Sequence, residues 1–307
     1  MKKKFSVLIC GLGMIGMDYQ SKKKDIYLNY CDLFKNSKNF FLKAGVDNNL
    51  KKRKKFRKKF NKKTYINLSS IKKEFFDIIV ICVNTKNFSK IYESIYLNQI
   101  KPLIFILEKP GGTNYLQLLK FKNYCKKNNI YVIMNYSRNY NFKLLKFFRD
   151  NLPKLGLVEE IKINYFKGIL NSCSHYISLL LKLNLINQNI KLIHTDIIKN
   201  KNDIFGNFKF FSKKKVLFNY EKSKEEKILF LGKKKNLCYY TERGEIFLLS
   251  KKQLNKKKFY INIDLNFILI LIRKIITKTI NSKNLDNEIN TLKIINNISN
   301  YKNEKKI

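Results

Sequence analysis

Three glycines near the N-terminus are the first residues whose spacing could support chemistry. Gly11, Gly13 and Gly16 follow an apolar run of strand length in the pattern G-x-G-x-x-G. In this pattern the first glycine permits a tight turn, the second lets the backbone approach a pyrophosphate, and the third lets the next helix pack against the strand. The N–H groups at the start of that helix, including those of Met14 and Ile15, would bind the phosphates. The stretch therefore predicts a dinucleotide-binding turn.

The same stretch also has the outline of a secretory signal, because Lys2–Lys4 precede the apolar run. Glycines in dinucleotide-binding register interrupt that run, and no small-residue cleavage site follows before Asp18. We therefore interpret the segment as part of the folded protein.

An acidic residue ends the next predicted strand. Asp47 follows the run Phe40–Val46, where a carboxylate accepts hydrogen bonds from the adenosine ribose hydroxyls and repels a 2′-phosphate. Lys51, Lys52 and Arg53 come next and could instead bind a 2′-phosphate, although a local basic run says little in a chain this basic. NAD is therefore the preferred cofactor and NADP the alternative.

Two further groups of polar residues follow predicted buried strands. They are Asn84 and Thr85 after the first strand, and Glu108, Lys109 and Pro110 after the second. Ligands of open α/β sheets bind at the carboxyl ends of the strands. We therefore expect both groups at the ligand-binding edge of the sheet.

Strands and helices alternate over the first half of the chain. The predicted strands are residues 5–10, 40–46, 75–83, 103–107 and 130–134, and the predicted helices follow Gly16, cover 26–34, 50–63 and 88–97, and connect the last two strands. This alternation predicts an α/β, doubly wound parallel sheet of the Rossmann type.

The second half has a different pattern. Strand-like segments at 158–166, 190–197, 208–211, 216–220, 227–231, 237–240, 245–249 and 259–263 are joined by short turns, with helices at 174–183, 265–280 and 286–298. Such a pattern predicts an α+β domain with a largely antiparallel, open-faced sheet. We place the boundary so that a dinucleotide-binding domain covers 1–135 and a domain for substrate binding and oligomerisation covers 136–307.

The formal net charge of +42 suggests a polyanion-binding protein. However, only six of the 64 basic residues are Arg, the residue suited to bidentate phosphate recognition, and Ala and Trp are almost absent while Lys, Asn and Ile abound. An A+T-rich coding sequence explains this composition, so we expect no specific nucleic-acid partner.

The six cysteines show no paired metal-ligand spacing. This favours a location in the reducing cytoplasm and predicts no metal site. The apolar run 267–272 is too short to cross a bilayer.

Several motifs occur together in an order that resembles one family. They are Gly11–Gly16, Ala44–Asp47, Asp77–Thr85, Glu108–Gly111, Asn135–Arg138 and Asn171–His175, with Thr291–Ile295 near the C-terminus. The chain is similar to the glucose–fructose oxidoreductase and inositol dehydrogenase (Gfo/Idh/MocA) family of NAD(P)-dependent sugar oxidoreductases. Within that family it most resembles members of surface-polysaccharide and nucleotide-sugar pathways.

The resemblance implies roles for particular residues. The catalytic residues would be Lys109 and His175. Lys109, beside the nicotinamide, would hydrogen-bond the substrate hydroxyl and help its proton leave, and His175 would act as general acid/base, a task that suits an imidazole. The substrate would be a sugar or nucleotide sugar, with Tyr136, Arg138 and Asn171 as binding candidates. Residues 11, 13–16, 47, 84, 85 and 108–110 would bind the cofactor. An open-faced second sheet also predicts a homo-oligomer, either a dimer or a tetramer.

Three departures from the family pattern leave alternatives open. Asn171 and Ser178 replace acidic residues that often flank the histidine, and Phe88 replaces a family histidine. Because an amide cannot stabilise an imidazolium as a carboxylate does, the chain could also be a catalytically silent dinucleotide-binding relative. A polyanion-binding basic protein is the third interpretation.

Overall fold

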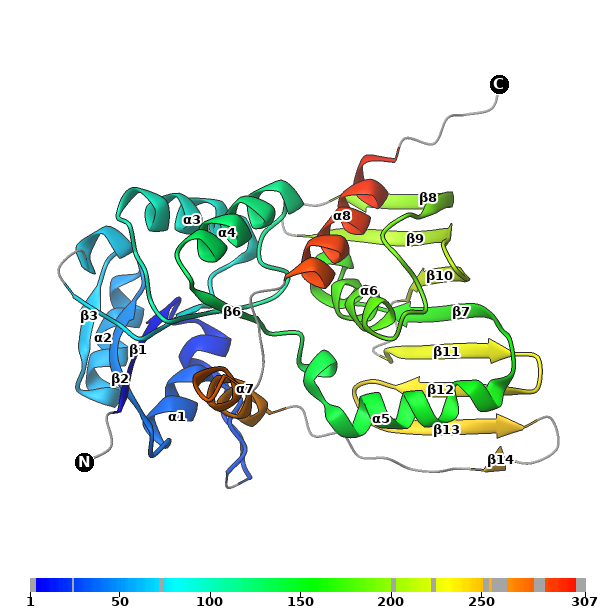
Figure 1. Ribbon diagram of the computed structural model, residues 1–307, viewed down its shortest axis with the longest axis horizontal. Helices are drawn as coiled ribbons and strands as arrows, with labels where there is room; N and C mark the ends of the chain where they lie inside the picture. The colour runs from blue at the N-terminus through cyan, green and yellow to red at the C-terminus, as the bar shows by residue number, and fades with distance from the viewer. Residues whose placement is uncertain are drawn as a thin grey trace. The chain divides into compact units, whose positions relative to one another are not determined.

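The computed structural model describes residues 4–23, 25–71, 74–199, 203–221, 225–250, 254–255, 264–278 and 285–301 (Figure 1). The chain forms two compact units. The first comprises Met1–Ser137 and Asp264–Asp286, and the second comprises Arg138–Ile263 and Asn287–Ile307. The chain therefore returns to the first unit after the second sheet, a return that the predicted division at residue 135 did not include.

The first unit contains a six-stranded parallel sheet in the order β3-β2-β1-β4-β5-β6. Its strands are β1 (Phe5–Cys10), β2 (Phe40–Val46), β3 (Lys63–Tyr65), β4 (Ile78–Ile81), β5 (Ile104–Leu107) and β6 (Tyr131–Met134). This order is that of the doubly wound dinucleotide-binding fold. Every residue of β4 and β5 is buried, as expected of central strands covered on both faces. The predicted Rossmann-type sheet is confirmed.

The helices of the first unit are α1 (Tyr30–Lys35), α2 (Leu50–Phe60), α3 (Phe88–Leu97), α4 (Tyr115–Lys127) and α7 (Asn266–Ile276). Helix α7 follows the second sheet in the chain, yet it packs against β6. The observed bounds of α3 are those predicted from the sequence.

The helix after the glycine turn is shorter than expected. It is a single π-helical stretch, η1, that covers Met14–Asp18, and the next helix begins only at Tyr30. Asn29 determines that start, because its side chain accepts a hydrogen bond from the backbone N–H of Asp32 at 2.8 Å and thereby caps the helix.

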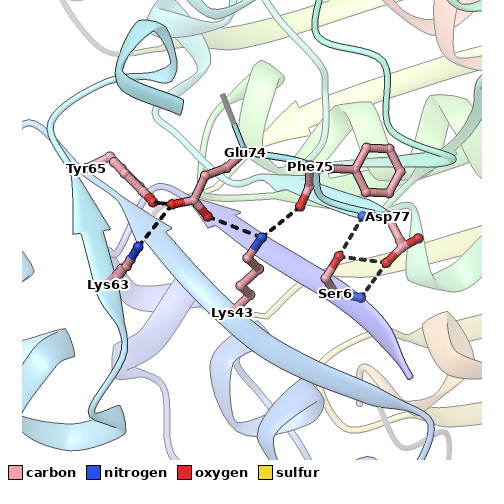
Figure 2. Close-up of polar contacts among 7 residues, drawn as sticks. All are labelled: Ser6, Lys43, Lys63, Tyr65, Glu74, Phe75 and Asp77. Atoms are coloured by element: carbon pink, nitrogen blue, oxygen red, sulfur yellow. Dashed lines mark hydrogen bonds and ion pairs between the residues drawn. The ribbon is translucent and has the colours of Figure 1, made fainter. Parts of the chain in front are cut away.

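Two polar clusters hold the strands of the first sheet together (Figure 2). The Glu74 carboxylate accepts a hydrogen bond from the Tyr65 hydroxyl and ion-pairs with Lys43 at 3.2 Å and Lys63 at 3.4 Å. The Tyr65 hydrogen bond is the main reason that the pKa of Glu74 is lowered, and both lysines add to this effect. Edge strand β3, which the sequence analysis did not predict, is thereby tied to the segment before β4.

The second cluster joins the two central strands. Ser6 donates both its backbone N–H and its hydroxyl to one oxygen of Asp77, at 2.7 and 2.6 Å, and the backbone N–H of Asp77 donates to the Ser6 hydroxyl at 3.0 Å. All these groups are buried. The pair therefore fixes β1 against the start of β4 (Figure 2).

In the second unit the described residues form an eight-stranded sheet in the order β14-β13-β12-β11-β7-β10-β9-β8. The strands are β7 (Val158–Tyr165), β8 (Lys191–Lys199), β9 (Ile204–Phe211), β10 (Lys215–Tyr220), β11 (Lys227–Gly232), β12 (Lys235–Tyr240), β13 (Glu245–Ser250) and β14 (Leu254–Asn255). Only the β7–β10 pair is parallel among these, so the predicted largely antiparallel sheet is confirmed. The strand predicted at 259–263 lies outside the described residues.

Helices α5 (Phe142–Asn151), α6 (Ser174–Lys182) and α8 (Asp286–Asn300) supply the core over this sheet. Phe148 of α5 makes edge-to-face contacts with Phe230 and Tyr239, with ring centroids 5.5 and 5.9 Å apart. The apolar side chains of these helices and of alternate strand residues form one continuous cluster. Only one face of the sheet is covered in this way by described helices, which lie together in Figure 1.

Candidate dinucleotide-binding and active site

Two of the three N-terminal glycines are required by the packing of the protein itself. Gly11 has φ +102°, and a Cβ atom there would lie 2.5 Å from the carbonyl oxygen of Cys82. At Gly16 a Cβ would lie 2.0 Å from the carbonyl oxygen of Gly11. Any side chain at either position would therefore push apart the turn or its contact with the end of β4.

Gly13 differs from its two neighbours. Its backbone is extended, with φ −84°, and a Cβ there would have a single described atom within 4 Å, the Nζ of Lys52 at 3.5 Å. Packing does not demand a glycine at this position. The open space above it is the close approach that a pyrophosphate would need.

A pocket of about 450 Å³ opens above this turn. The lining includes Gly11, Gly13, Asp47, Lys52, Ile66 and Asn84. It lies at the carboxyl ends of β1, β2 and β4, which is the ligand edge of such a sheet. Ile66 follows β3 directly, so the Glu74 cluster helps to position this wall of the pocket.

Asp47 is firmly held at the edge of the pocket. One carboxylate oxygen accepts the backbone N–H of Leu12 at 2.8 Å and the other accepts that of Asn49 at 2.8 Å. Arg53 lies beneath the same loop and is 9% exposed. Its guanidinium donates to the backbone carbonyls of Asp47 and Asn48 at 2.7 and 2.9 Å. Arg53 therefore supports the loop, a role that its place in a basic run did not suggest.

The residues that follow β4 differ in their exposure to solvent. Asn84 is exposed and lines the pocket, and its side chain caps a short helical turn by accepting the N–H of Lys86 at 3.3 Å. Thr85 is half-buried in that turn. Phe88 is fully buried and packs against Tyr92, so it serves the core of the first unit.

Glu108 and Lys109 follow β5, and the Lys109–Pro110 peptide bond is cis. The Glu108 carboxylate accepts the Tyr30 hydroxyl at 2.8 Å and the Asn135 side-chain N–H at 2.5 Å. Burial raises the pKa of Glu108, while these hydrogen bonds and the positive charge of Lys109 act in the opposite direction. A buried, hydrogen-bonded carboxyl group thus directly precedes the predicted catalytic lysine.

Tyr30 and Asn135 were not predicted as partners of Glu108. Tyr30 is fully buried, and burial followed by the charge of Glu108 raises its pKa well above the ordinary value. Asn135 follows β6 and also donates to the Tyr30 hydroxyl at 3.0 Å. Because the three residues come from separate elements, no sequence spacing connects them.

In the second unit, His175 is the second residue of α6 and is half-buried. The turn before this helix, η6 (Ile169–Cys173), is anchored by Asp203. One Asp203 oxygen accepts the N–H of Leu170 at 2.8 Å, and the other accepts the backbone and side-chain N–H groups of Asn171 at 3.1 and 2.8 Å. Asn171, predicted to bind substrate, thus also anchors the turn.

A second buried acidic residue, Glu226, is hydrogen-bonded to the same turn and to the start of α6. It accepts hydrogen bonds from the hydroxyls of Ser172 and Tyr176, the residues on either side of the Cys173–His175 segment. The Arg138 guanidinium lies over the Tyr176 ring at 5.3 Å and is 8% exposed. Arg138 therefore lies in the interior of the second unit.

The remaining candidates are also buried. Ser178 is fully buried and accepts the side-chain N–H of Asn139 at 2.7 Å. Tyr136, in the first unit, is 1% exposed.

All six cysteines are buried and none forms a disulfide. Among the described residues no cluster of three or more His, Cys, Asp or Glu could hold a metal ion, and no described helix has the length and apolarity to cross a bilayer.

Several solved structures of oxidoreductases share this architecture. A 3-ketoreductase from Actinomadura kijaniata in complex with NADP matches with a TM-score of 0.79 over 97% of each chain, at 8% identity. A dehydrogenase named MviM from Clostridium difficile matches with a TM-score of 0.72 over 97% of this chain and 99% of its own, at 16% identity. The chain has the fold of these oxidoreductases.

A third similar structure is a biliverdin reductase from Synechocystis in complex with biliverdin and NADP⁺. Its TM-score is 0.77 over 96% of this chain and 98% of its own, at 13% identity. The 3-ketoreductase is also known with both NADP and TDP-benzene bound, at a TM-score of 0.77 and 9% identity over 97% of each chain. No protein-family model matches the chain, and no curated protein matches it by sequence. The likeness is therefore one of fold.

Proposed function

We propose that the protein is an NAD(P)-dependent oxidoreductase that transfers hydride between a nicotinamide cofactor and a hydroxyl or ketone of a sugar or nucleotide sugar. The observation that carries the proposal is Gly13, which packing leaves open onto a pocket at the ligand edge of the sheet. The solved structures of the same fold include reductases with bound NADP, one of them with TDP-benzene as well. The backbone and pocket of the first unit therefore suit a dinucleotide.

The nicotinamide, when bound, supplies or accepts the hydride. Lys109 is assigned the hydrogen bond to the reacting substrate oxygen, which stabilises the charge that develops there. Glu108 precedes Lys109 and is held in place by its hydrogen bonds from Tyr30 and Asn135. His175 is assigned the proton transfer as general acid/base, with the turn before it held by Asp203. Asn171 remains a candidate for substrate binding.

NAD is the proposed cofactor in preference to NADP. Asp47 presents its carboxylate at the edge of the pocket, where it favours ribose hydroxyls over a 2′-phosphate. Arg53 cannot readily turn to a 2′-phosphate, because its guanidinium is bonded to two backbone carbonyls. NADP in the similar structures is the reason to test both cofactors.

A homo-oligomer through the outer face of the second sheet is part of the proposal. Leu229 and Phe247 are half-buried apolar residues on that face and pair with the buried Cys238 between them. Association with a second copy of the chain would remove the part of these two side chains that is still exposed from water. Light scattering tests it: a mass of two or four chains is expected, and a monomer would contradict it.

The reaction is tested by a pair of lysine variants at opposite ends of β5. Lys109→Ala should abolish NADH-dependent reduction across a panel of nucleotide-sugar ketones while NADH binding stays nearly intact. Lys101→Ala, an exposed lysine before the amino end of β5, is the control and should keep full turnover. Unchanged turnover in Lys109→Ala would contradict the assignment.

A catalytically silent dinucleotide-binding protein is the second candidate. Ser178 favours it, because this position after His175 is fully buried and bonded to an amide instead of presenting a carboxylate. In that case NADH would bind with no turnover of any panel member. Sustained turnover of one sugar would exclude it.

A further inference from the structure

The short helix after the glycine turn poses an electrostatic problem for a bound pyrophosphate. A helix macrodipole is the sum of many aligned peptide dipoles, yet η1 has only the five residues Met14–Asp18. The turn is also close to negative charge, because the Asp47 carboxylate accepts the N–H of Leu12 inside it. The backbone can offer N–H donors there, but it contributes little positive potential.

The side chain of Lys52 lies beside this turn. Its Nζ is 3.5 Å from the position that a Cβ of Gly13 would take, and the lysine lines the same pocket. Its backbone is fixed at the start of α2, where its N–H donates to the Asn49 side chain at 3.3 Å. The side chain is half-buried, which strengthens the field of its ammonium at the turn.

The neighbouring cations of α2 have other positions. Arg53 is bonded to backbone carbonyls, Lys55 ion-pairs with Asp18 at 2.6 Å, and Lys51 is exposed and outside the lining of the pocket. Of these residues of α2, Lys52 is the one directed at the glycine turn.

We propose that the Lys52 ammonium binds the pyrophosphate of the dinucleotide, and so replaces the positive potential that a longer helix would supply. This inference rests on the proposed function, since it assigns a ligand group within the same site. An ammonium is a compact charge with three donors and suits a phosphate oxygen without demanding one geometry. Because the pyrophosphate is common to both cofactors, Lys52 contributes equally to NAD and NADP.

The experiment is calorimetric titration of wild type, Lys52→Ala and Lys52→Arg with NADH, NADPH and adenosine. Lys52→Ala should bind both dinucleotides about 10- to 100-fold more weakly, as expected for the loss of one charge-assisted hydrogen bond. The ratio of the two affinities should not change. Lys52→Arg should recover part of the loss, and adenosine, which has no phosphate, should bind all variants alike. Lys54→Ala, an exposed lysine of the same helix outside the pocket lining, is the matched control and should behave as wild type. Thermal unfolding confirms that each variant is folded.

The outcomes separate this inference from the proposed function. Equal binding of the dinucleotides by Lys52→Ala and wild type overturns the inference. A loss of affinity confined to NADPH also overturns it, because Lys52 would then bind the 2′-phosphate and not the pyrophosphate. Dinucleotide binding with the expected losses but no hydride transfer would overturn the proposed reaction and leave this inference standing. A wild type that binds neither dinucleotide overturns both.

Discussion

The two glycines at positions 13 and 16 should respond to the same substitution in opposite ways. In Gly16→Ala the new methyl group would lie 2.0 Å from the carbonyl oxygen of Gly11, well inside contact distance. In Gly13→Ala it would meet only the flexible end of Lys52, at 3.5 Å. One variant therefore tests the packing of the turn, and the other tests the space reserved for a ligand.

The expected magnitudes follow from these distances. Overpacking a tight site costs about 1–3 kcal/mol, and the backbone contact at Gly16 places it at the upper end, about 3 kcal/mol. For a domain of this size each kcal/mol lowers the melting temperature by about 2–4 °C, so a drop of roughly 6–12 °C is expected. Gly13→Ala should change the free energy of unfolding by less than about 0.5 kcal/mol. It should nonetheless weaken NADH binding at least about tenfold, or 1.4 kcal/mol.

Two assays on the same preparations give the answer. Denaturant unfolding reports the stability of each variant, and calorimetric titration with NADH reports the site. The reasoning is refuted if Gly13→Ala binds NADH as wild type does. It is equally refuted if Gly16→Ala is as stable as wild type, since the turn would then have room that the structure denies it.

Three further predictions concern the elements around the site. Glu74→Gln should lower the unfolding free energy by about 1 kcal/mol near neutral pH. The pKa of Glu74 is lowered in the fold, so its contribution is complete above the ordinary value of 4.5 and is lost as the pH falls through the lowered value; unfolding at several pH values should show the difference vanish in acid, and a constant difference would contradict it. Asp203→Ala leaves the N–H groups of the η6 turn without their acceptor and should cost about 2–3 kcal/mol, with turnover reduced and NADH binding kept, whereas the exposed Asp196→Ala should change neither; equal effects would remove the positioning role. Phe148→Ala should cost about 3–5 kcal/mol in denaturant unfolding, and a loss below 1 kcal/mol would show that the ring contacts contribute little.

The parts of the fold that were predictable from sequence depend on local patterns. The buried strands of the first sheet are continuous apolar runs, and the helix predicted at Phe88–Leu97, between two of them, has these observed bounds. The glycine spacing likewise locates the turn, because Gly11 and Gly16 have steric requirements that no other residue meets. These features need only neighbouring residues to be recognised.

The features that were missed depend on contacts between distant segments. Helix η1 ends at Asp18, although the dinucleotide-binding pattern predicts a helix that continues after Gly16. Helix α7 belongs to the first unit because of packing against β6, which no periodicity records. Arg53 was grouped with its basic neighbours, whereas its guanidinium is bonded to the loop after β2. Asp203 holds the turn before His175 from more than thirty residues away.

The central claim is that a nicotinamide dinucleotide binds at the glycine turn of the first unit. Its most direct test is a calorimetric titration of the wild-type protein with NADH, repeated with NADPH and in the presence of ADP-ribose. The account predicts saturable binding at one site per chain, tighter for NADH, that ADP-ribose displaces. Folded protein that binds neither dinucleotide at millimolar concentration would contradict it.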